Sequence, residues 1–402
     1  MTEAMWSEKV PESAGVLDGG MQICFPDMPR KTARIAIGLL FLLCGAVLFR
    51  YLRQNGQHDF MPFYLGAKLA ASGHMARLYD PTAYQPFIAE LRSQGERLNK
   101  DDALYFIRPA FEAFLYVPLT WLPYRQASLL ALVANFGLLG LLIWKLPIWF
   151  NLRPSHRPWI RCALAIFYPF LWSIAVGQDT LLLTLLVSYA LVLESKGRQG
   201  SAGFVLGLCA WKPHLIWLLP LALLAGRRFR MAAYSMVTGS ALLALSFGAV
   251  GMAGMRQWAV LLQSSSTDIK PFDMGNIRAL TISGGALLAA SAVGLLVVCF
   301  CVALCYGSFY EKFSAAVFAA LLVSPHTYWQ DYSLMALIAM ITTRRWMRVV
   351  LLLPWPFLYS RTDELPMIAI ALGFITVLAG AQMPERWPIL RKQLVTDGVR
   401  DL

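Results

Sequence analysis

The chain has 402 residues, of which 58% are hydrophobic and only 14% are charged. This composition excludes an ordinary soluble domain, in which about a quarter of the residues are charged. The net charge of +12 does not indicate a nucleic-acid partner, because the basic residues lie in short clusters between apolar segments. We expect these clusters to contact anionic membrane lipids.

The chain begins with a polar, mixed stretch that lacks the basic-then-apolar order of a cleavable signal. We expect residues 1–33 to form a cytoplasmic N-terminal tail and residues 383–402 to form a cytoplasmic C-terminal tail. Apolar segments recur from Ile35 to Ala381, so residues 34–382 form the predicted membrane domain.

A membrane-spanning helix needs about 20 mainly apolar residues. The segments of adequate length are 34–51, 125–145, 159–176, 179–194, 231–253 and 282–306, and the shorter ones are 201–212, 213–226, 312–324, 331–343, 346–359 and 366–382. Together they predict an all-α polytopic protein of the cell (inner) membrane with about twelve transmembrane helices. Both termini then lie in the cytoplasm, and the basic clusters fall on the cytoplasmic side, as the positive-inside rule requires.

The first extracytoplasmic loop, residues 52–108, is predicted to be the longest, and it carries Asp59 just after the first span. An aspartate at the membrane surface can act as a general base. It can equally cap a short helix from Pro62 to about Ala76, because Asp is a favoured cap residue, and the local sequence leaves both roles open. Residues 109–122 are apolar but short and bounded by prolines, so we expect a re-entrant or interfacial helix there.

Further breaks between predicted helices place polar residues on the same side as Asp59. The polar set on this side is Asp59, Glu112, Gln178, Asp179, Lys212, His214, Asn276, Arg278, His326 and Asp331. It contains carboxylates for proton abstraction and cations for a phosphate leaving group. Structural explanations also exist: Lys212 can extend to lipid headgroups, Asp331 can cap the next helix, and Glu112 can pair with Arg108.

The order of several short motifs resembles glycosyltransferase family 87 from about residue 35 to residue 340. The motifs are Asp59-Phe60-Met61-Pro62-Phe63-Tyr64, Leu78-Tyr79-Asp80-Pro81, Gly177-Gln178, Gly207-Leu208-Cys209-Ala210-Trp211-Lys212-Pro213, Asn276-x-Arg278-Ala279-Leu280 and Ser324-Pro325-His326. The resemblance implies a helical bundle of the GT-C type. It also implies a polyprenol-phosphate-mannose-dependent mannosyltransferase-like enzyme, which transfers a sugar with inversion on the extracytoplasmic side to a lipid or glycan acceptor.

The resemblance also implies roles for individual residues. Asp59 is the expected general base, and the residues expected to bind the donor phosphate or the substrate are Lys212, His326, Arg278, Asn276, Gln178, Asp331 and Tyr64. Two positions depart from the family pattern: Arg108-Pro109-Ala110 stands where Tyr-Pro-Pro is common, and Asp179 stands where Asn is common. Apart from the lipid-linked donor we expect no cofactor, and we expect no metal, because the predicted outer loops contain no Asp-x-Asp motif.

Two other functions are compatible with the sequence. A secondary transporter or lipid-linked-sugar flippase often has ionisable residues on broken membrane helices, and the break at Lys212 fits that description. A non-catalytic scaffold for polysaccharide assembly is the third possibility.

Overall fold

The computed structural model describes residues 30–55, 57–96, 105–268, 276–277, 285–324, 326–342 and 351–352. All regular elements in these ranges are helices. The predicted tails, the predicted spans 346–359 and 366–382, and Arg278 lie wholly or mostly outside the described residues.

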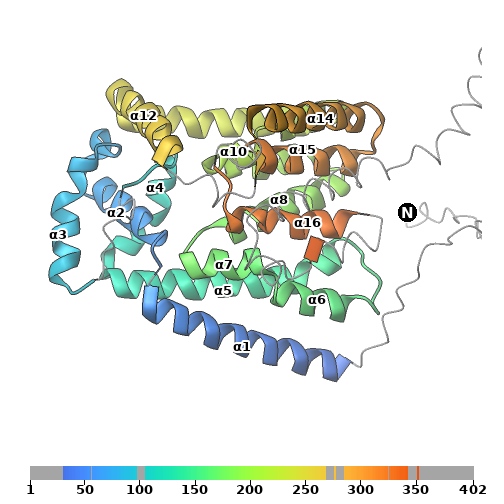
Figure 1. The fold of residues 1–402 in the computed structure, drawn as a ribbon, viewed down its shortest axis with the longest axis horizontal. Coiled ribbons are helices and arrows are strands. Elements are labelled where there is room, and N and C mark those ends of the chain that lie inside the picture. Colours follow the sequence, from blue (N-terminus) through green and yellow to red (C-terminus); the bar gives the residue numbers. More distant parts are fainter. Residues whose placement is uncertain are drawn as a thin grey trace, which may run out of the picture.

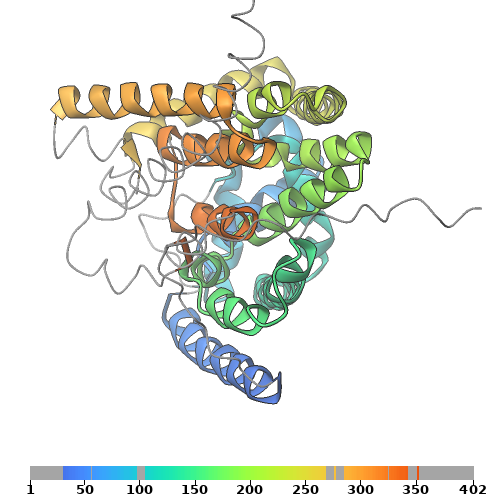
Figure 2. The same ribbon diagram turned by 90° about the vertical axis from the view of Figure 1, so that its right-hand side faces the viewer.

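The main body is a bundle in which α1 and α14 lie on opposite sides (Figures 1 and 2). Its helices are α1 (Arg30–Asn55), α5 (Tyr124–Trp149), α6 (Arg157–Ala165), α7 (Tyr168–Val176), α8 (Thr180–Ser195), α9 (Gln199–Leu208), α10 (Pro213–Ile216), α11 (Leu219–Ala225), α12 (Phe229–Asp268), α14 (Gly285–Tyr306), α15 (Phe309–Val323) and α16 (Leu334–Ile341). Helix α9 packs on α8 and α12, and α15 packs on α11 and α14. Most residues of the central helices α8, α15 and α16 are buried, and most of these buried residues are apolar, as expected for helices in the middle of a bundle.

Four segments of the described chain are long and apolar enough to cross a membrane, namely Tyr124–Trp149, Arg157–Val176, Phe229–Gln263 and Gly285–Tyr306. Their outer faces carry exposed apolar side chains, such as Val237 at 69% and Leu287 at 82% exposure, which a lipid bilayer would cover. The described part of the chain is therefore all-helical, and the protein is a multi-pass membrane protein. The twelve crossings expected from the sequence remain a prediction.

Several helices are broken where the sequence contains proline or glycine. The predicted interruption near Lys212 is confirmed: α9 is followed by a short 3-10 helix, η4 (Cys209–Trp211), and Pro213 begins α10. Helix α12 bends at Gly251, whose φ of 68° and ψ of −179° are accessible almost only to glycine. These breaks expose backbone and polar side chains inside an otherwise apolar bundle.

The chain between α1 and α5 forms a separate helical unit at one end of the bundle, on the left of Figure 1. We call residues 57–96 and 105–122 the cap unit. Its elements are α2 (Phe60–Ala71), η1 (Met75–Arg77), η2 (Pro81–Tyr84), α3 (Gln85–Ser93), α4 (Ala110–Tyr116) and η3 (Val117–Trp121). Helices α4 and η3 are only seven and five residues long, too short to cross a hydrocarbon layer of about 30 Å.

An aromatic core holds the cap unit together. The rings of Phe63 and Tyr116 stack at 5.1 Å, and the ring of Tyr64 meets that of Tyr124 edge-on at 5.4 Å. Helix α12 fixes the entry to α4 from outside: Trp258 Nε1 donates to the carbonyl of Ile107 at 2.7 Å. The cap unit therefore sits on the bundle in a defined position, and the candidate site lies where the two meet.

Candidate active site

Asp59 lies directly before α2, at its N-cap position, but its side chain makes no capping hydrogen bond. Its backbone N–H donates to the carbonyl of Val176 at 3.0 Å, and its Oδ2 accepts from Gln178 Nε2 at 3.0 Å. The side chain is 31% exposed, and His58 Nε2 lies 3.7 Å from Oδ1. The carboxylate is therefore held by the turn after α7 and not by the helix it precedes, which removes the capping explanation.

The turn between α7 and α8 brings Gln178 to Asp59. Gly177 ends α7 with a φ of 82°, in the left-handed region that favours glycine. A Cβ atom at Gly177 would lie 2.7 Å from the Cβ of Phe60, so a side chain here would also separate α2 from the turn. Both the backbone conformation and the close approach require glycine, and together they place Gln178 beside the carboxylate.

Gln178 connects Asp59 to a buried cation. Its Oε1 accepts a hydrogen bond from Arg108 Nη2 at 2.8 Å, and its Nε2 donates to Asp59. The side chain of Arg108 is 14% exposed, and its Nη2 lies 4.0 Å from Asp179 Oδ1. Because the guanidinium can only donate and the carboxylate can only accept, the amide of Gln178 has one favourable orientation.

Lys212 is the second cation of the site, and it is only 1% exposed. Its Nζ donates to Asp331 Oδ1 at 2.8 Å and lies 3.7 Å from Asp179 Oδ1. The other oxygen of Asp331 accepts from the backbone N–H of Tyr328 at 3.0 Å, so Asp331 caps the 3-10 helix η6 (Trp329–Ser333) as well as pairing with Lys212. Lys212 does not extend to the surface, which removes the explanation that it reaches lipid headgroups.

These contacts connect side chains from helix breaks that are far apart in the sequence. We call the resulting series of residues the polar chain. Its members, in order of contact, are Asp59, Gln178, Arg108, Asp179, Lys212 and Asp331. The structure therefore brings together four residues that the sequence predicted for the site. Arg108 was not predicted as a site residue, although a cation directly before Pro109, at the start of a short apolar stretch, was a usable signal.

The other predicted residues are placed differently. Asn276 is buried, and its Nδ2 donates to the carbonyl of Ser324 at 2.7 Å, which ties it to the turn that carries His326. His326 is half-buried, with its ring 5.9 Å from that of Tyr328. Tyr64 is 2% exposed, and its hydroxyl donates to the carbonyl of Leu122 at 2.8 Å, so it belongs to the aromatic core of the cap unit and not to the polar chain.

For both Asp59 and Arg108, burial and the neighbouring charged groups shift the pKa in opposite directions. Burial raises the pKa of Asp59 above its ordinary value, and His58, Gln178 and the two cations oppose this shift only partly. Burial lowers the pKa of Arg108, but the acidic groups around it raise this pKa by more, so Arg108 keeps its charge. The base therefore binds a proton more readily than an ordinary aspartate, and the cation beside Gln178 is permanent.

Buried polar atoms without a hydrogen-bond partner gather around the polar chain. Those that belong to the polar chain, to its sequence neighbours or to Glu112 are Arg108 Nη1, both carboxyl oxygens of Glu112, Asp179 Oδ1, Trp211 Nε1 and Gln330 Oε1, whereas Arg161 Nε lies elsewhere. Most buried polar atoms in proteins are hydrogen-bonded, so this concentration is unusual. Among the residues that the structure describes, no three His, Cys, Asp or Glu side chains are grouped closely enough to hold a metal ion.

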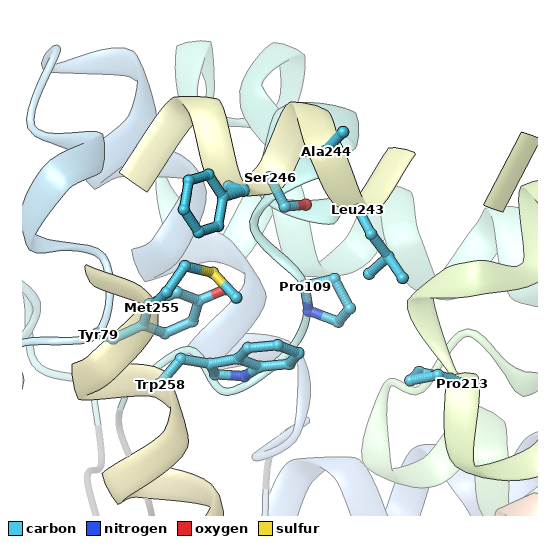
Figure 3. Close-up of a pocket in the computed structure, with 9 residues that line it drawn as sticks. Tyr79, Pro109, Pro213, Leu243, Ala244, Ser246, Met255 and Trp258 are labelled. Carbon is cyan, nitrogen blue, oxygen red and sulfur yellow. The ribbon is translucent and has the colours of Figure 1, made fainter. Parts of the chain in front are cut away.

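An apolar cavity of about 510 Å³ adjoins the polar chain. Figure 3 shows Leu243, Ala244 and Ser246 on one limb of α12, Met255 and Trp258 on the other, and Tyr79, Pro109 and Pro213 facing them. Two of the lining prolines are sequence neighbours of the cations Arg108 and Lys212. The cavity therefore places an apolar surface next to the charged part of the site.

Comparison with known protein families gives one match. Residues 106–354, more than half of the chain, match glycosyltransferase family 87. The matched region contains Arg108, Gln178, Lys212 and Asp331, and it begins after Asp59. No similar curated protein and no similar solved structure was found.

Proposed function

The chain belongs to glycosyltransferase family 87, and from this premise we propose that it transfers a sugar from a polyprenyl-phosphate donor to a lipid or glycan acceptor. Membership of the family makes the chain a membrane glycosyltransferase, with a sugar donor and an acceptor as substrates, and not a transporter, flippase or scaffold. The observation that best supports the proposal is the position of Asp59. Its carboxylate is partly exposed and makes no helix-capping hydrogen bond, and Gln178 links it to the buried cation Arg108.

The proposed reaction is a single displacement with inversion. Asp59 accepts the proton of the acceptor hydroxyl as the oxygen attacks the anomeric carbon of the donor sugar, and the bond from that carbon to the phosphate oxygen breaks. The polyprenyl phosphate leaves with the bonding electron pair, so cations near it lower the barrier. We assign direct phosphate contacts to the partly exposed Arg108 and His326. Lys212, already paired with two carboxylates, acts by its charge and by holding Asp331.

The apolar cavity supports a lipid-linked donor, because Pro109 in its lining directly follows Arg108, one of the residues proposed to contact the phosphate. Replacing Ala244 by tryptophan is expected to fill part of the cavity and to raise KM for a long-chain polyprenyl-phosphate sugar by about tenfold, the cost of losing the contacts of one or two isoprene methylenes. A donor analogue with a very short chain should be used equally well by the variant and the wild type.

Leu245→Trp is the matched control for this substitution, because Leu245 is 65% exposed and does not line the cavity. The two variants add a large side chain at adjacent positions of the same helix, so a general effect on α12 should appear in both. An unchanged KM for the long-chain donor in Ala244→Trp would remove the cavity from the donor site.

The orientation in the membrane is also proposed. We place the multi-pass chain in the cell membrane with both termini in the cytoplasm and the polar chain on the extracytoplasmic side, following the distribution of basic residues. Reporter fusions after Phe150 and after Asp331 are expected to report cytoplasmic and extracytoplasmic locations, respectively. The reverse pattern would place the site on the cytoplasmic side and exclude this orientation.

Mannose is the proposed sugar, and this choice rests on the resemblance of the motifs to mannosyltransferases of the family. Asn276, Gln178 and Asp331 are proposed to lie near the sugar or its phosphate, together with Arg278, which lies outside the described residues. A panel of polyprenyl-phosphate hexoses and pentoses tests the choice directly. Preference for a sugar other than mannose would change the assigned substrate but not the proposed mechanism.

A further inference from the structure

Glu112 is a buried carboxyl group that the proposed mechanism does not use. It lies in the first turn of α4 and is 0% exposed, and neither of its oxygens has an ordinary hydrogen-bond donor. An ionised carboxylate in such a position is very unfavourable unless a cation or several donors compensate it. The groups around it must therefore either neutralise its charge or keep it protonated.

The charged and titratable groups that face Glu112 come from several elements. They are Arg108 from the start of the same segment, Asp179 from the turn after α7, Lys212 from the break before α10, and the phenols of Tyr79 and Tyr116. Neither nearby cation donates to Glu112: Arg108 Nη2 donates to Gln178, Lys212 Nζ donates to Asp331, and Arg108 Nη1, although it has no partner, makes no hydrogen bond to either oxygen of Glu112. The hydroxyl of Tyr79 donates to the carbonyl of Arg108.

The remaining partner of Glu112 is Asp179, whose side chain is within hydrogen-bonding reach of it. Asp179 Oδ1 also lacks an ordinary donor, although Lys212 Nζ lies 3.7 Å away and Arg108 Nη2 lies 4.0 Å away. Two ionised carboxylates only accept hydrogen bonds and repel each other. A single proton between them replaces this repulsion with a hydrogen bond from one carboxyl group to the other.

We propose that Glu112 is protonated and donates its carboxyl hydrogen to Asp179, and that this pair positions Asp179 between Arg108 and Lys212. Glu112 is then a positioning residue: it acts on Asp179, which lies beside Arg108, and Arg108 contacts the base Asp59 through Gln178. Its effect on transfer therefore rests on the proposed function. The shared proton also leaves one fewer negative charge beside the place proposed for an anionic phosphate.

The direction of the protonation shift agrees with this geometry. Burial and the charge of Asp179 raise the pKa of Glu112 well above its ordinary value of 4.5, and the opposing effects of Arg108 and Lys212 are smaller. Above pH 4.5 the unfolded chain releases this proton while the folded protein keeps it, so the folded state loses stability relative to the unfolded state as pH rises. Glu112→Gln keeps a donor and abolishes this pH dependence.

The first experiment measures the proton itself, by infrared spectroscopy of the purified full-length protein in detergent at neutral pH. Wild type is expected to show the carbonyl absorption of a protonated carboxylic acid, and Glu112→Gln is expected to lose it. Glu90→Gln is the control, because Glu90 is 43% exposed and pairs with Lys68, so that variant should keep the band. A wild-type spectrum without the band, or a band of undiminished intensity in Glu112→Gln, would overturn the proposal.

The second experiment compares Tm as a function of pH. The Tm of Glu112→Gln minus that of wild type is expected to grow as pH rises from 4.5 toward 8, whereas for Glu90→Gln the difference should stay flat. A Tm difference for Glu112→Gln that stays constant with pH would show that Glu112 binds a proton equally well in the folded and unfolded states, and would contradict the proposal. Neither experiment depends on sugar transfer, so both test the protonation of Glu112 even if the proposed function is wrong.

The positioning role is tested with the same variants in the transfer assay. Glu112→Ala leaves Asp179 without its donor, and the loss of one buried hydrogen bond predicts a fall in transfer rate of about tenfold or more. Glu112→Gln is expected to retain most of the wild-type rate, because its amide N–H can donate to Asp179. Equal rates for Glu112→Gln and Glu112→Ala would overturn the positioning role.

Discussion

Asp59→Asn is expected to lower the rate of sugar transfer by about 10²- to 10⁴-fold, the usual contribution of a positioned general base. The amide is nearly the same size as the carboxylate, and its oxygen can still accept the hydrogen bond from Gln178, so Tm should change little. Transfer is measured with purified protein in lipid vesicles and a radiolabelled lipid-linked sugar, after thermal unfolding has shown that the variant folds.

Asp80→Asn is the matched control for this variant. Asp80 belongs to the same cap unit, where it caps η2 and pairs with Arg77 near the surface, and it lies outside the polar chain. We expect this variant to lose some stability but to keep its activity. Equal losses of activity in both variants would attribute the effect to the cap unit, and full activity of Asp59→Asn would assign proton abstraction to another group.

Lys212→Met is expected to have the largest effect on stability. The substitution keeps an unbranched side chain but leaves Asp331 and Asp179 buried without their nearest cation, and removing one partner of a buried ion pair costs about 3–5 kcal/mol. The free energy of unfolding in detergent should fall by this amount, and sugar transfer should be lost with it.

A double variant separates the charge from the packing in this prediction. Asp331→Asn removes the uncompensated charge but keeps an oxygen that can accept from the backbone N–H of Tyr328. Combined with Lys212→Met, it is expected to recover a substantial part of the lost free energy. If Lys212→Met alone is as stable as wild type, the buried ion pair does not organise the site.

Much of the helical framework could be predicted from the sequence, because apolar runs and their interruptions have a direct physical meaning. The breaks at Gly177 and at Lys212-Pro213 were recognisable, since glycine adopts a left-handed φ and proline cannot continue a helix. The number of crossings was less accessible, because several apolar segments form helices of fewer than ten residues, such as α11.

The contacts within the site could not be predicted in the same way. Asp59 and Gln178 are 119 residues apart, as are Lys212 and Asp331, and only the packing of the bundle decides that these pairs meet. Tyr64 shows the opposite difficulty. It is close to Asp59 in sequence, but it lies on the same helical face as Phe60, and that face packs into the aromatic core.

The most direct test of the central claim is the choice of donor. Purified wild-type protein in lipid vesicles would be given either radiolabelled polyprenyl-phosphate mannose or a radiolabelled nucleotide-linked mannose, with a membrane lipid extract as acceptor. We predict a labelled product from the polyprenyl-phosphate donor alone and none with Asp59→Asn. A product formed from the nucleotide-linked sugar, or transfer that Asp59→Asn leaves undiminished, would contradict the account.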